Sequence, residues 1–217
     1  MKSIMVHAGG DAAFESRLQV GLDLARRFHG HMSFILPRPT QDYVAFDMFG
    51  GAHFVAEAFE AAENEREKLC TRIDARLKTE DVPWDWQVFD GTTSDALIDA
   101  ARLADVLVMS LDSPGAAGTA RAWISDVVTA SRTPVLAVPA KATRLSFDRA
   151  MVAYDGGFEA ANALRAALPL LQAASFVRIS EIEIVPQQFP VTDAAMYLSR
   201  HGINAEIAVA AKGDQSV

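Results

Sequence analysis

The chain has 217 residues and a mass of 23.4 kDa; half of its residues are hydrophobic and 22% are charged. This composition supports a sizeable buried core and excludes an intrinsically disordered chain. The net charge of −8, from 20 basic and 28 acidic residues, argues against a nucleic-acid-binding surface.

The sequence also lacks the usual signs of a membrane, secreted or metal-binding protein. No apolar run reaches the roughly 18 residues that a membrane-spanning helix needs. The single cysteine, Cys70, excludes an intrachain disulfide and fits a reducing compartment. The five histidines include no pair at metal-ligand spacing. We therefore expect a cytoplasmic protein without a metal site, a nucleic-acid partner or a membrane partner.

Strand and helix patterns alternate along the first 140 residues or so. The segment SIMVHAGGD, residues 3–11, is an apolar strand that runs into Gly9-Gly10, and Asp11 is expected to cap the helix that follows. The predicted strands lie near 3–7, 31–36, 84–89, 104–110 and 134–138. With right-handed crossovers, this pattern predicts a doubly wound, Rossmann-like α/β domain over 1–142, with a five-stranded parallel sheet of order 3-2-1-4-5.

Between the second and third strands, the sequence predicts an irregular loop followed by a long helix. Residues 38–53 are rich in glycine and aromatics, which indicates a lid or a contact surface that presents Phe46, Met48 and Phe49. A helix from Phe54 to about Lys78 carries the charged block 63–68, which we interpret as a solvated face. Trp84 and Trp86 alternate with Asp85, so both rings are expected on one face of the sheet, against helices.

The pattern then restarts as an internal repeat. AMVAYDGG, residues 150–157, repeats the register of SIMVHAGG, and further strand and helix patterns follow up to Val217. We therefore expect a second, incomplete copy over 146–217 with three strands in order 3-2-1. Strand 150–154 would then have an unpaired edge. Truncation of a longer tandem protein is our first explanation and homodimerisation our second; packing against the first domain is also open.

The order of these elements resembles the universal stress protein family. The resemblance rests on AMVAYDGG with the helix ALRAALPLL, on DALIDAARLADVLVMS and on SRTPVLAVP, and it covers nearly the entire chain. It implies the adenine nucleotide alpha hydrolase-like fold in a tandem member with a truncated second copy. It also implies a role in the stress response and homodimers that pair through their final strands.

Members of this family that bind ATP carry an acidic residue at the end of the first strand and a glycine-rich phosphate loop. Gly115 and Gly118 match the first two glycines of that loop, but the third is missing, and Arg121-Ala122 stands where Gly-Ser belongs. Aligning the two copies places Gly9 opposite Asp155, so the first copy lacks the acid. The second copy keeps Asp155 and Gly156 and ends before a phosphate loop.

These residues define a degenerate nucleotide site, with ATP as the candidate cofactor. We expect a ligand of the first domain to lie between the ends of strands one and four and to touch Gly9, Gly10, Gly115 and Gly118. Arg121 could pair with a phosphate oxygen. The expected function is that of a non-catalytic stress-response protein. A weak ATP hydrolase and a ligand-free dimerisation scaffold are the alternatives.

Overall fold

The computed structural model describes residues 1–38, 52–111, 119–182 and 189–210. The chain divides into two compact units, Met1–Leu145 and Ser146–Val217, and each is described by itself.

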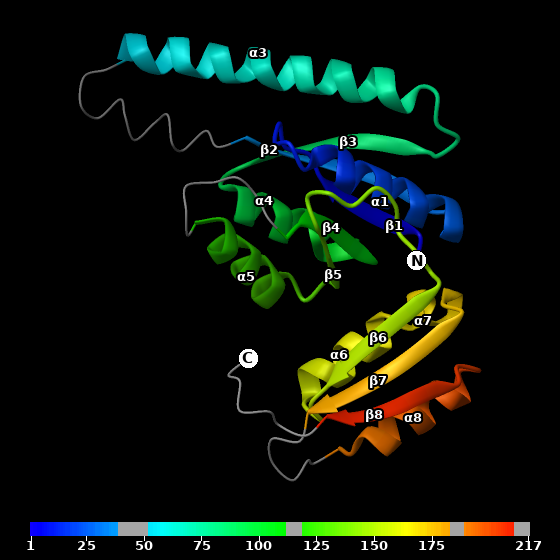
Figure 1. Ribbon diagram of the computed structural model, residues 1–217. Coiled ribbons are helices and arrows are strands. Elements are labelled where there is room, and N and C mark those ends of the chain that lie inside the picture. Colours follow the sequence, from blue (N-terminus) through cyan, green and yellow to red (C-terminus); the bar gives the residue numbers. More distant parts are fainter. Residues whose placement is uncertain (39–51, 112–118, 183–188, 211–217) are drawn as a thin grey trace. The chain divides into compact units, whose positions relative to one another are not determined.

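The first unit contains a five-stranded sheet. Its strands are β1 (Ser3–His7), β2 (His31–Arg38), β3 (Trp84–Asp90), β4 (Val106–Ser110) and β5 (Val135–Val138). They lie in the order β3-β2-β1-β4-β5, and every neighbouring pair is parallel (Figure 1). The predicted sheet order and direction are confirmed, with strand ends within two residues of the expected ones.

Helices connect these strands and cover the two faces of the sheet. They are α1 (Phe14–Phe28), α3 (Ala52–Leu77), α4 (Thr93–Ala100), continued by a 3-10 turn (Ala101–Leu103), and α5 (Thr119–Ser131). One face packs through Met5, Leu107 and Met109 against Leu97 of α4 and Val127 of α5. The other carries Phe34, whose ring lies 6.4 Å from that of Phe14 in α1. Burying a large apolar side chain contributes about 1.5–3 kcal/mol, so both layers stabilise this unit.

Helix α3 is anchored at its carboxyl-terminal end. Ile73 and Leu77 are fully buried there. The indole nitrogen of Trp86 donates a hydrogen bond of 2.9 Å to the carboxylate of Asp74, which ties α3 to β3. Trp84 packs edge-on against Trp86 with ring centroids 6.0 Å apart, so both tryptophans lie on the α3 side of the sheet, as their spacing predicted.

The second unit is a smaller α/β layer. Its strands β6 (Arg149–Tyr154), β7 (Phe176–Ile182) and β8 (Ala205–Ala210) form a parallel sheet in the order β6-β7-β8, joined by α6 (Phe158–Ala166), α7 (Leu168–Ala173) and α8 (Val191–Arg200). This connectivity repeats that of β1, β2 and β3. Its core is built around Ile179 and Leu198, which are fully buried.

Two local expectations need correction. The helix predicted over ALRAALPLL is divided into α6 and α7, because Pro169 has no N–H to continue the hydrogen-bond ladder and is placed in the first turn of a new helix. The cap position of α1 is Ala13 rather than Asp11. Asp11 Oδ1 accepts the backbone N–H of Ala13 at 2.9 Å, but its main partner is a side chain of the helix itself.

Candidate functional site

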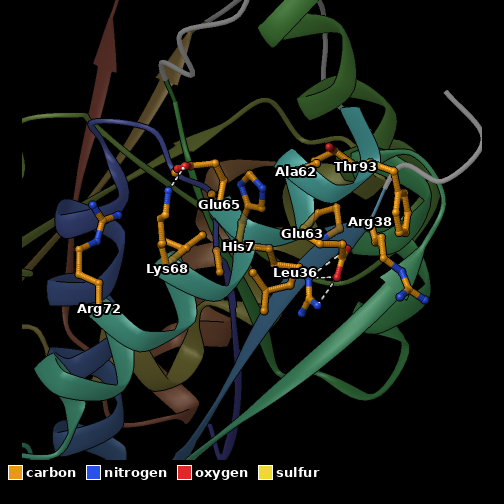
Figure 2. Close-up of a pocket in the computed structure, with 16 residues that line it drawn as sticks. His7, Leu36, Arg38, Ala62, Glu63, Glu65, Lys68, Arg72 and Thr93 are labelled. Carbon is orange, nitrogen blue, oxygen red and sulfur yellow. Dashed lines mark hydrogen bonds and ion pairs between the residues drawn. The ribbon is translucent and has the colours of Figure 1, made fainter. Parts of the chain in front are cut away.

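A cavity of about 620 Å³ lies at the carboxyl ends of β1 and β2, beneath α3 (Figure 2). Its floor is formed by the strand ends and the loop after β1, through residues such as Leu36 and Gly10. Helix α3 supplies the roof and Thr93 of α4 contributes at one side. Cavities of this size accommodate small-molecule ligands, and the carboxyl ends of parallel strands are where open α/β sheets bind them.

Beside this cavity, a fully buried arginine joins β1 to β4. Arg17 of α1 has no exposed surface. Its Nε donates to the carbonyl of His7 at 2.9 Å, and its guanidinium also donates to the hydroxyl of Ser110 at the end of β4. The helices that follow these two paired strands, α1 and α5, pack on opposite faces of the sheet, so β1 and β4 meet at its topological switch point. In this chain, the guanidinium of Arg17 occupies the space at that point.

The carboxylate of Asp11 compensates the charge of Arg17. The two guanidinium nitrogens Nη1 and Nη2 bind Oδ1 and Oδ2 at 3.0 and 2.6 Å. Burial favours the neutral carboxylic acid, but the hydrogen bonds and charge of Arg17 outweigh it and lower the pKa of Asp11. Asp11 is therefore ionised at neutral pH, as one half of a bidentate ion pair.

His7 is almost fully buried beside this pair. Burial, together with the positive charge of Arg17, lowers the pKa of His7 from 6.5 to about 4, although the charge of Asp11 opposes the shift. The imidazole is therefore neutral at physiological pH.

Four basic and two acidic side chains line the cavity. Three of the basic ones are paired. Arg38 forms a bidentate pair with Asp90, which lies opposite it in the β2–β3 register. Arg66 pairs with Glu63 and Lys68 pairs with Glu65. Within the described part of the chain, Arg72 has no hydrogen-bond or ion-pair partner. The cavity thus has an excess of positive charge in a chain whose net charge is −8.

The predicted site residues of the first unit are only partly placed. Gly9 and Gly10 line the cavity. Gly115 and Gly118 lie outside the described residues, and Arg121 lies in the first turn of α5, where its side chain is not described. The structure therefore brings the first βα turn, with Gly9 and Gly10, together with α3. The phosphate loop with Gly115 and Gly118 stays a prediction from the sequence.

Asp155 and Gly156 form a turn in the second unit. Asp155 Oδ1 accepts the backbone N–H of Gly157 at 2.8 Å, and Gly156 has a φ of 76°, a conformation that favours glycine. Counted from the strand ends, the residue of the first unit that corresponds to Asp155 is Ala8 rather than Gly9, because β1 ends at His7 and β6 ends at Tyr154. Neither Ala8 nor Gly9 supplies a carboxylate.

Sequence reasoning missed Arg17, Ser110, Lys68 and Arg72. The sequence did contain a signal for Arg17. It lies on the buried stripe of α1 with Phe14, Gly21 and Ala25, and a charged residue at such a position is unusual. Lys68 gave no such signal, since it belongs to the charged block 63–68 that we interpreted as a solvated face, and nothing in the sequence singled out Arg72.

The described residues contain neither a metal-binding cluster nor a membrane-spanning helix. Among the described residues, no group of three or more His, Cys, Asp or Glu side chains could hold a metal ion. None of the helices in the described ranges is both long and apolar enough to cross a membrane.

No protein-family model matches the sequence, and no curated protein is similar enough to match it. Solved structures are similar. A universal stress protein from Archaeoglobus fulgidus DSM 4304 is 16% identical, with a TM-score of 0.68 over 97% of this chain and 77% of that one. The hypothetical protein MJ0577, whose biochemical function was assigned from its structure, is 13% identical, with a TM-score of 0.50 over 64% of this chain and 96% of that one.

A third structure, the cytoplasmic domain of a prokaryotic cation chloride cotransporter, is 11% identical and has a TM-score of 0.44. The similarity to the Archaeoglobus fulgidus protein, at 16% identity, concerns the fold alone. The chain therefore has the fold of a universal stress protein.

Proposed function

We propose that this chain is a universal stress protein-like, non-catalytic stress-response protein, and that its first unit binds an adenine nucleotide in the cavity beneath α3. The observation that carries the proposal is the cavity itself. It combines an apolar floor, which includes Leu36 and Pro37, with an excess of positive charge. An adenine nucleotide matches this combination, because its flat base can pack on the apolar floor and its phosphate can bind the basic side chains.

The charges of the cavity favour binding over catalysis. Arg66 donates hydrogen bonds to Glu63 and lowers the pKa of that carboxyl, which makes it a weak general base. His7, with its pKa lowered to about 4, is neutral and buried. A hydrolase needs a base that activates water, and Glu63 and Glu65 are both paired with cations of α3. This pairing supports a non-catalytic function over that of a weak hydrolase.

Thermal unfolding tests the binding site. All three tryptophans belong to the first unit, so tryptophan fluorescence reports the unfolding of that unit. Adenosine, AMP, ADP or ATP at millimolar concentration should raise the melting temperature, because a ligand bound by the native state alone stabilises it. No shift with any of the four would overturn the proposal, and steady phosphate release from ATP would overturn its non-catalytic part.

A matched pair of variants locates the site. Ala62 lines the cavity from α3, and its neighbour Ala61 is exposed and lies outside that lining. Ala62→Trp should fill the cavity and abolish the ligand-induced shift. Ala61→Trp should leave the shift unchanged. Equal loss in both variants, or in neither, would place binding elsewhere.

We also propose that the protein acts in the cytoplasm as a homodimer. The single cysteine supports the reducing compartment. The open edge of β6 supports self-association, because within the described residues this strand pairs only with β7.

A further inference from the structure

One end of the cavity contains two backbone N–H groups that have no partner among the described residues. Gly9 and Gly10 both line the cavity directly after β1. In the described part of the chain, neither of their N–H groups donates a hydrogen bond. Among the residues that the structure describes, a β-carbon on Gly10 would meet no atom within 4 Å, so none of them fills the space beside this turn.

Two cations of α3 belong to the same end. Lys68 and Arg72 are one helical turn apart and therefore lie on one face of the helix. Figure 2 shows both on the far side of His7 from Arg38. Arg72 also lines a second hollow together with Asp11 and Phe14, which places it near the loop that contains Gly9 and Gly10.

Both cations can receive a ligand. Arg72 has no partner within the described residues. Lys68 pairs with Glu65 at 2.7 Å, but both side chains are more than 70% exposed, and surface pairs of this kind are weak. Arg38, in contrast, is held by two hydrogen bonds to Asp90.

The nearest carboxylate does not make this end unfavourable for an anion. The charge of Asp11 is compensated by Arg17, which binds both of its oxygens. The guanidinium thereby offsets the negative charge that lies beside Gly9. Free backbone N–H groups next to Lys and Arg side chains form the donor set that recognises phosphate oxygens.

We propose that the N–H groups of Gly9 and Gly10, with Lys68 and Arg72, bind the phosphate group of the ligand. This inference rests on the proposed nucleotide function and assigns the phosphate to the first βα turn and α3, instead of the loop with Gly115 and Gly118. The adenine then lies toward Leu36 and Pro37.

The phosphate subsite can be tested without a nucleotide. In the ¹⁵N-labelled full chain, sodium pyrophosphate should shift the backbone amide signals of Gly9 and Gly10, relative to sodium chloride of equal ionic strength. The shifts should saturate, and they should be lost in the Lys68→Gln/Arg72→Gln double variant. Unshifted Gly9 and Gly10 signals, or shifts that persist in the double variant, would overturn the inference.

Affinities for AMP and adenosine test the same subsite within the nucleotide site. The wild type should bind AMP more tightly than adenosine. Arg72→Gln should weaken AMP binding about tenfold, the loss expected for one charge-assisted hydrogen bond, and leave adenosine binding unchanged. Arg102→Gln is the matched control, because Arg102 is exposed and pairs with Asp99 outside the cavity lining.

The two proposals fail in different ways. If pyrophosphate shifts Gly9 and Gly10 but neither adenosine nor AMP binds, the nucleotide function is wrong and the anion subsite stands. If adenosine and AMP bind with an affinity ratio that Arg72→Gln does not change, the nucleotide function stands and the phosphate subsite is wrong.

Discussion

The Oδ2 atom of Asp11 lies 2.7 Å from the position that a β-carbon on Gly9 would occupy. Gly9→Ala should therefore push the carboxylate away from Arg17 and reduce the free energy of unfolding by about 1–3 kcal/mol. Gly10→Ala is the matched control, because its β-carbon would meet none of the described residues within 4 Å, and its stability should change by less than about 0.5 kcal/mol. Urea unfolding followed by tryptophan fluorescence measures both; equal effects would contradict the tight packing at Gly9.

Arg17→Met should destabilise the first unit strongly, since it leaves Asp11 without its cation and Ser110 without its donor. Removing one partner of a buried ion pair costs about 3–5 kcal/mol. Adding Asp11→Asn to this variant should recover part of the loss, because the uncompensated charge is then gone. The midpoint of urea unfolding measures each variant. Strictly additive effects of the two substitutions would contradict the coupling.

Acidification should destabilise the first unit through His7. In the unfolded chain this imidazole binds a proton near pH 6.5, whereas in the native chain it does so only near pH 4. The unfolded state therefore holds more protons between these values, and about 3 kcal/mol of stability should be lost as the pH falls from 6.5 to 4. Unfolding free energies across this window measure the slope. His7→Gln should flatten it; an unchanged slope in this variant would contradict the assignment to His7.

The hydrogen bond between Trp86 and Asp74 should control the position of α3. Trp86→Phe keeps the ring and removes the donor, so stability should fall by about 0.5–1.5 kcal/mol. Ligand affinity should fall with it, because the roof of the cavity is then held less firmly. Isothermal titration with AMP measures this effect. Unchanged affinity in a destabilised Trp86→Phe variant would show that this bond does not position the site.

Self-association should depend on Met151. This side chain of the edge strand β6 is 70% exposed, and it points away from the face that packs through Val152 and Tyr154. If the homodimer buries this edge, Met151→Lys should convert it to a monomer in light scattering. Met196→Lys, at a 52% exposed methionine of α8, should remain dimeric. A monomeric wild type, or equal effects of both variants, would contradict the proposed interface.

The sequence alone predicted the sheet of the first unit. Strand patterns such as SIMVHAGG depend on hydrophobic periodicity, and parallel strands with right-handed crossovers leave few orders for the sheet. The division at Pro169 was missed although its cause is local. The turn at Gly9-Gly10 was also recognised as a candidate binding element, because a glycine pair after an apolar strand is a local signal.

Only the tertiary structure decided what surrounds that turn. Arg17 and Ser110 are separated by 93 positions, and no pattern in either segment indicates that one donates to the other. Lys68 belongs to a block that the sequence alone indicates as a solvated helix face, and only the packing of α3, through bonds such as that between Trp86 and Asp74, brings Lys68 and Arg72 to the cavity. The composition of a binding site is a property of distant segments brought together, whereas strands and turns are properties of neighbouring residues.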